Sequence, residues 1–131
     1  MWRRDIRNKL FTLFVLALFM TSGRISAHHS IAATYFGDQT QQIKGKIVML
    51  IYRNPHSFVE VEANDEKGKK QTWAIEWAAS SQLDMFGVKE EIKLGDAVTV
   101  VGNPGRNPAD HRLRLVKVTR TANGWTWSGS F

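Results

Sequence analysis

Residues 80–87 read SSQLDMFG, and this short stretch decides the fold because strand-like segments lie on both sides of it. A serine in front of the apolar residues and a glycine behind them are typical of a short helix, with the serine as its cap and the glycine as its stop. Its length allows barely two turns. We therefore expect one short helix between two groups of strands.

Six segments around this helix are predicted to be strands, because they are rich in β-branched residues or alternate between apolar and polar side chains. They are residues 43–52, 58–63, 71–77, 97–101, 113–119 and 125–127. Three strands before a helix and two or three after it is the order of a small Greek-key barrel of the OB type. An open sheet or a sandwich is the competing architecture. The single helix favours the barrel, because between the third and fourth strands it can close one end.

The third predicted strand has two distinct faces. Trp73, Ile75 and Trp77 lie on one face, and Glu76 lies on the other. Tryptophans in this arrangement either fill a small core or line a groove, and barrels of this type can bind sugars or bases on exposed rings. Trp73 and Trp77 are therefore candidate ligand-binding residues.

The two strands after the helix are less clearly defined. The fourth strand is expected to end at the sequence GNPG (102–105), where glycine and proline are typical of a turn. In residues 113–119, Leu113 and Leu115 share a face with a lysine, whereas Val118 lies on the opposite face. The alternation therefore does not decide which face of this strand is buried.

The first 27 residues are typical of a secretory signal peptide. Arginines and a lysine precede an apolar or small run of 11 residues from Leu10 to Met20, and the small residues Ser26 and Ala27 follow. A membrane-spanning helix needs about 20 apolar residues. We therefore predict a signal peptide at 1–27, an N-terminal arm at 28–42 and an OB-like β-barrel domain at 43–131, in a periplasmic or secreted protein that contacts the membrane only during export.

Charge and cysteine content exclude several function classes. The whole chain has a formal charge of +6, but residues 1–27 carry +4 of it, which leaves a nearly balanced domain. Such a domain lacks the excess of basic side chains that a nucleic-acid partner requires. The chain has no cysteine, so thiol catalysis and thiolate metal sites are excluded. No common catalytic or nucleotide-binding motif is present, and we expect a protein that is not an enzyme.

Several motifs of the chain resemble a family of small exported bacterial proteins catalogued only as a domain of unknown function. They are Ala27-His28-His29-Ser30, residues 44–48, Asn54-Pro55-His56, Trp73-Ala74-Ile75-Glu76, residues 83–87 and residues 94–100. The chain departs from the pattern at Val88, where an aromatic residue is expected, and in residues 103–112. The resemblance implies export and an OB-like β-barrel, and it brings no activity, cofactor or site with it.

The histidines are candidate metal ligands. Cleavage after Ala27 would make His28 the first residue, with a free amine beside two imidazoles, and nitrogen ligands of this kind suit copper or zinc. His56 lies at a tight corner, and Glu76 is a candidate fourth ligand or supporting carboxylate. The alternative interpretation is that His28 and His29 belong to the cleavage site and that His56 only fixes its corner.

The sequence thus predicts an exported, non-enzymatic binding or accessory protein whose ligand or envelope partner is unknown. A periplasmic protein that binds copper or zinc through His28 is the second interpretation. A module that binds a protein or a carbohydrate is the third.

Overall fold

The computed structural model describes residues 31–131, so the predicted signal peptide, His28 and His29 lie outside the described residues. The chain divides into two compact units, Met1–Ala33 and Thr34–Phe131. Within the described residues, no helix has the length and apolar character needed to cross a membrane. The second unit contains the strands found among residues 31–131 and is the part of the chain considered below.

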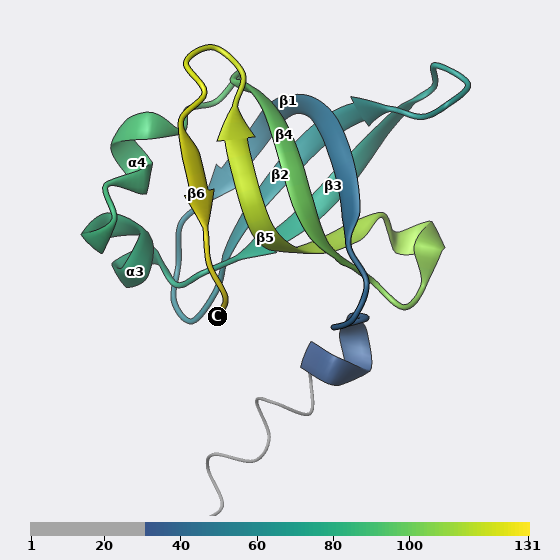
Figure 1. Cartoon of the computed structure of the whole chain (residues 1–131), viewed down its shortest axis with the longest axis horizontal. Coiled ribbons are helices and arrows are strands. Elements are labelled where there is room, and N and C mark those ends of the chain that lie inside the picture. Colours follow the sequence, from purple (N-terminus) through teal and green to yellow (C-terminus); the bar gives the residue numbers. More distant parts are fainter. Residues whose placement is uncertain (1–30) are drawn as a thin grey trace, which may run out of the picture. The chain divides into compact units, whose positions relative to one another are not determined.

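Five of the strands form a closed barrel, and a sixth extends it (Figure 1). They are β1 (Gln41–Ile51), β2 (Ser57–Asn64), β3 (Lys70–Trp77), β4 (Ala97–Pro104), β5 (Arg112–Arg120) and β6 (Thr126–Ser128). Antiparallel neighbours follow the order β3-β2-β1-β4-β5-β6, and a short parallel pairing of β3 with β5 closes the barrel. The predicted OB-like barrel is confirmed.

Strand β1 bends sharply, so that it pairs with two different strands along its length. Its first half pairs with β4 and its second half with β2. Gly45 lies where the two pairings overlap, and a Cβ atom there would lie 2.2 Å from the carbonyl oxygen of Glu62. The register shifts between Ile47 and Met49, which is a bulge that bends the strand. A glycine and a bulge are typical of the places where a barrel strand turns a corner.

The core is formed by the alternating apolar residues of the strands together with Leu83, Val88 and Ile92 from the helical connection. In β5, Leu113 and Leu115 are buried, Lys117 is exposed and Val118 is buried again. The buried face changes because the β4–β5 register shifts after Val101, leaving one extra residue in β5. The first half of β5 therefore buries the face of Leu113 and Leu115, and the second half buries the opposite face, which carries Val118.

The helical connection differs from its prediction in two ways. It contains two short helices, α3 (Ser80–Met85) and α4 (Val88–Glu91), separated by Gly87 with a φ of 65°. The predicted glycine stop is present, but the predicted serine cap is wrong, because α3 has no side-chain cap of its own. The β1–β2 loop caps α3 instead: the Ser80 N–H donates to the Arg53 carbonyl at 3.0 Å, and the Ser81 N–H donates to Asn54 Oδ1 at 3.3 Å.

Strand β4 continues beyond its predicted end, through Gly102 to Pro104. Gly102 packs tightly against β5, since a Cβ atom there would lie 2.6 Å from the Arg114 carbonyl oxygen. The glycine is thus used for close packing within the sheet, and the predicted turn at 102–105 is wrong. The turn comes later, where the 3-10 helix η1 (Pro108–Asp110) joins β4 to β5.

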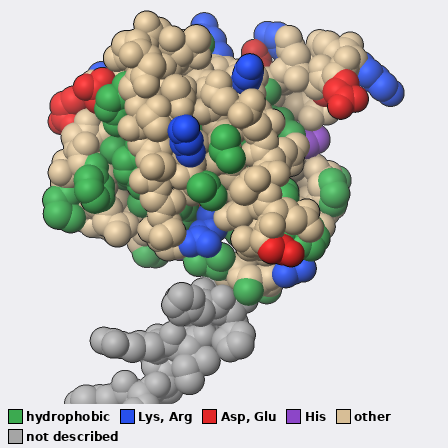
Figure 2. Space-filling model, viewed as in Figure 1, with side chains coloured by type: hydrophobic (Ala, Val, Ile, Leu, Met, Phe, Trp, Pro, Cys, Tyr) green, Lys and Arg blue, Asp and Glu red, His purple; other side chains and the backbone are tan. Residues whose placement is uncertain are grey.

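Apolar side chains are also exposed on the side of the barrel where α3 and α4 lie (Figure 2). Met85 and Phe86, at the end of α3, are 77% and 66% exposed. The neighbouring hollow is lined by Gln82 and Phe86 together with Trp125 and Trp127 at β6.

Candidate functional site

His56 and Glu76 form the centre of a polar cluster on the outside of the barrel. Nδ1 of His56 and Oε1 of Glu76 are 2.5 Å apart. The strand register brings them together: Phe58 lies opposite Glu76, and His56 lies two residues before Phe58, so it is the diagonal neighbour of Glu76 on the same face. The carboxylate accepts the hydrogen bond, so Nδ1 donates and Nε2 remains as the nitrogen that can bind a ligand.

Both side chains are partly shielded from solvent. The His56 side chain is 31% exposed and the Glu76 side chain 12% exposed. The ring of Phe131 lies edge-on to the imidazole, with 5.4 Å between the ring centroids. The guanidinium carbon of Arg114 lies 4.8 Å from the centre of the same phenyl ring. The imidazole is therefore held in one orientation while part of it stays accessible.

Tyr35 binds the second oxygen of the Glu76 carboxylate. Its hydroxyl donates to Oε2 at 2.7 Å, and its side chain is almost completely buried. Burial raises the pKa of Tyr35 above its ordinary value, and the hydrogen bond to Glu76 and the negative charge of Glu76 raise it further. Tyr35 therefore stays a neutral donor, and its bridge to Gly105 holds the segment before β1 against the barrel.

Arg112 supplies positive charge near the same carboxylate. Its Nη2 lies 4.0 Å from Glu76 Oε2, and its guanidinium carbon lies 5.8 Å from the centre of the Tyr35 ring. The parallel β3–β5 pairing explains this position, because it matches Ala74 with Arg112 and Glu76 with Arg114 and puts both arginines on the outer face with Glu76.

The structure brings together two of the four predicted metal ligands, His56 and Glu76. The other two, His28 and His29, lie outside the described residues. Among residues 31–131, no three side chains of His, Cys, Asp or Glu lie close enough to hold a metal ion. The described part of the cluster thus supplies one oriented imidazole and its supporting carboxylate, the arrangement that is common around metal-binding histidines.

Four members of the cluster were not predicted as site residues: Tyr35, Arg112, Arg114 and Phe131. Tyr35 is the residue with the clearest signal, since it and Phe36 form a pair of adjacent aromatic residues ahead of the first predicted strand. Arg112, Arg114 and Phe131 have no such signal, because their positions depend on barrel closure and on the path of the chain after β6.

The two predicted ligand-binding tryptophans have different environments. Trp77 is 1% exposed and its ring lies edge-on to Trp127, with centroids 5.4 Å apart, so it is a core residue and cannot contact a ligand on the surface. Trp73 is only partly buried, and its ring lies 5.2 Å from that of His111. Of these two tryptophans, only Trp73 lines a surface groove.

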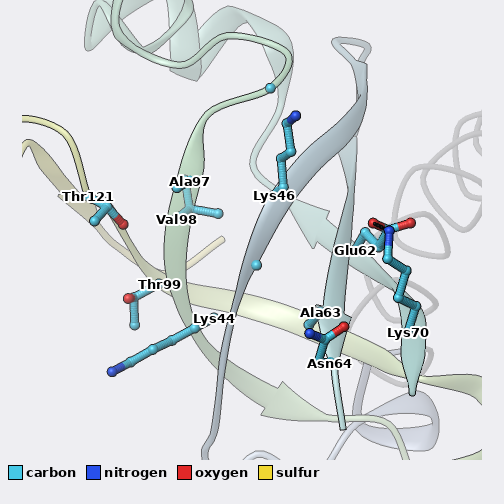
Figure 3. A pocket seen from close by; sticks show the side chains of 12 residues that line it. Lys44, Lys46, Glu62, Ala63, Asn64, Lys70, Ala97, Val98, Thr99 and Thr121 are labelled. Atoms are coloured by element: carbon cyan, nitrogen blue, oxygen red, sulfur yellow. Dashed lines mark hydrogen bonds and ion pairs between the residues drawn. The ribbon is translucent and has the colours of Figure 1, made fainter. Parts of the chain in front are cut away.

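A hollow of about 760 Å³ lies over β1, β2 and β4 (Figure 3). It is wide open, and the side chains of Lys44 and Lys46 point in different directions within it (Figure 3). Lys70 is paired with Glu62 at 2.8 Å. No side chain lining this hollow is both buried and charged, so it is a weaker candidate site than the His56–Glu76 cluster.

In a comparison with known protein families, a family model matches residues 17–114. The matching model describes a family of unknown function, DUF6152. The match includes Tyr35, His56, Glu76 and Arg112, and it ends before Phe131. No curated protein matches the chain.

Proposed function

The chain belongs to DUF6152, a family of unknown function, and from that premise we propose that it is an exported, non-enzymatic binding protein whose ligand is a transition-metal ion of the copper or zinc type. The proposed ligands are the amine and imidazole of His28, the imidazole of His29 and the imidazole of His56. Glu76 orients His56.

The observation that supports this function is the hydrogen bond between His56 and Glu76. A histidine that donates Nδ1–H to a carboxylate has a fixed ring orientation and a fixed tautomer, which are two properties that metal-binding histidines obtain from their supporting residues. Imidazole nitrogens prefer copper and zinc over magnesium or calcium.

The anchoring of Tyr35 supports the involvement of the two preceding histidines. Tyr35 is bound to the same carboxylate as His56, and His28 comes seven residues before it in the chain. Seven residues span at most about 25 Å. The proposed metal site requires His28 and His29 to lie within that span of Tyr35.

The proposal of export rests on residues 1–27 alone. The proposal that the protein is not an enzyme rests on the residues that make up the cluster. The described cluster has no nucleophile beside His56: its neighbours are a carboxylate, an aromatic ring and arginines. An oriented imidazole without a nucleophile fits ligand binding better than acyl transfer, which needs a serine or cysteine within hydrogen-bond distance of the base.

The test is a titration with Cu(II) of three forms: the chain beginning at His28, the same chain preceded by one N-acetylated alanine, and the His56→Gln variant. Blocking the His28 amine and removing the His56 imidazole are each expected to weaken binding by at least about tenfold. The control is His111→Gln, which alters a histidine outside the cluster. Equal affinity in the unextended chain and in His56→Gln would exclude His56 as a ligand.

A protein- or carbohydrate-binding module is the second candidate function. The observation that favours it is the exposed groove beside Trp73, which is separate from the metal ligands proposed above.

A further inference from the structure

Trp73 lies in the middle of a depression on the barrel surface. One hollow of about 390 Å³ is lined by Trp73, His111, Phe36, Gln39, Gln41 and Gln71, among others. A second hollow of about 410 Å³ shares Trp73, Gln41 and Gln71 with the first and extends to the β2–β3 hairpin. The two hollows are thus neighbours along one groove, with the indole at the point that they share.

We infer that this groove, here called the Trp73 groove, is a second binding site, and that it binds an uncharged oligosaccharide. Its position on the barrel fits this class of ligand. The loop with η1 joins β4 to β5, and barrels of the OB type bind oligosaccharides and oligonucleotides beside this loop.

The backbone at His111 brings a second ring to the groove. His111 has a φ of 45°, and it is the only non-glycine residue with a positive φ among residues 31–131. Ala74, which follows Trp73 in β3, donates its N–H to the His111 carbonyl oxygen at 2.9 Å. This hydrogen bond holds His111 beside Trp73. The imidazole and indole lie at 58° to each other with centroids 5.2 Å apart, so they form an angled aromatic surface.

Amide side chains surround this aromatic surface. Gln39, Gln41 and Gln71 line the first hollow, and Asn64 lines the second. Each amide provides both donors and an acceptor, and sugar hydroxyls likewise donate and accept. An aromatic face for the apolar side of a sugar ring, bordered by amides for its hydroxyls, is the combination that an oligosaccharide needs.

The charges around the groove disfavour a nucleic acid. Arg112 is the only charged residue that lines the first hollow, and its charge is partly offset by Glu76, whose Oε2 lies 4.0 Å away. The second hollow has two acidic side chains, Asp65 and Glu66, against one basic side chain, Lys44, so on balance it would repel phosphates. An uncharged chain of sugars meets no such repulsion.

The test is NMR titration of the protein isolated from producing cells, in the presence of a metal chelator so that the result does not depend on the proposed metal site. The probes are chitotetraose and cellotetraose, and the signal is the indole N–H of Trp73, assigned through Trp73→Phe. We expect saturable shifts of this signal with at least one tetrasaccharide, while the indole signal of Trp125 stays unchanged.

Two variants locate the site. His111→Gly keeps a residue that tolerates positive φ but removes the ring, and it is expected to weaken binding by about tenfold, or about 1.4 kcal/mol. Gln82→Ala, at the exposed surface of α3, is the control and should bind as the unchanged chain does. The inference is overturned if neither tetrasaccharide shifts the Trp73 signal, if His111→Gly binds unchanged, or if a proline-rich peptide shifts the signal and the sugars do not.

Discussion

The Tyr35 hydroxyl lies 2.7 Å from Glu76 Oε2 although the two residues are 41 positions apart in the sequence. The other oxygen of the same carboxylate binds His56. One side chain on β3 therefore fixes both the corner before β2 and the segment before β1. Changes to this carboxylate should affect stability and ligand binding together.

Replacing Tyr35 by phenylalanine should lower the free energy of unfolding by about 1.5–3 kcal/mol, because a buried hydrogen bond to a charged group is lost. Urea denaturation measures the change. Tyr52→Phe is a matched control, since the buried Tyr52 hydroxyl has no hydrogen-bond partner among the described residues, and its loss should cost little. Equal losses in the two variants would contradict the role assigned to Tyr35.

The stability contributed by Tyr35 should depend on pH. Burial and the Glu76 carboxylate raise its pKa in the folded protein, so the folded state favours the protonated phenol. This contribution is complete below the ordinary tyrosine pKa of about 10 and declines as the pH rises above it. The stability difference between the unchanged chain and Tyr35→Phe should therefore narrow above about pH 10. A stability difference between the two proteins that stays constant from neutral to alkaline pH would contradict this prediction.

Glu76→Gln should weaken binding of Cu(II) by about 10- to 100-fold, because the amide is a poorer acceptor for the His56 Nδ1–H. Competition with a chelator of known affinity measures the change. Glu62→Gln removes a carboxylate that is paired with Lys70 at the surface and is the control. If both variants bind the metal equally well, Glu76 does not support a metal ligand.

Gly45→Ala should destabilise the barrel by at least about 3 kcal/mol, because overpacking against backbone cannot be relieved by a side-chain rotation. The new Cβ atom would lie 2.2 Å from the Glu62 carbonyl oxygen. Gly37→Ala is the comparison, since a Cβ atom there meets nothing within 4 Å. Thermal unfolding that is unchanged in Gly45→Ala would mean that β1 does not cross between its two partners at this residue.

Mass spectrometry of the protein from an envelope fraction should give His28 as its first residue, because residues 1–27 have the order of a cleaved signal. Recovery of the chain from the cytosol with Met1 still attached would contradict both export and the proposed role of the His28 amine.

The sequence was sufficient to predict the local elements. Alternation at every second residue identified β2 and β3 and the shared face of Ile75 and Trp77, but not whether Trp77 is buried, and Gly87 identified the end of α3. The sequence also singled out His56 and Glu76, whose chemical types are evident without a structure. These features depend on neighbours close in the chain, and local conformational preferences are enough to encode them.

Only the tertiary structure decided how these elements meet. The pairing of β3 with β5 brings Arg112 beside Glu76, the extra residue in β5 moves its buried face, and the path before β1 places Tyr35 on the same carboxylate. Each of these depends on the register between strands that are far apart in the chain. The register is set by closing the whole barrel around one core, and no short stretch of sequence specifies it.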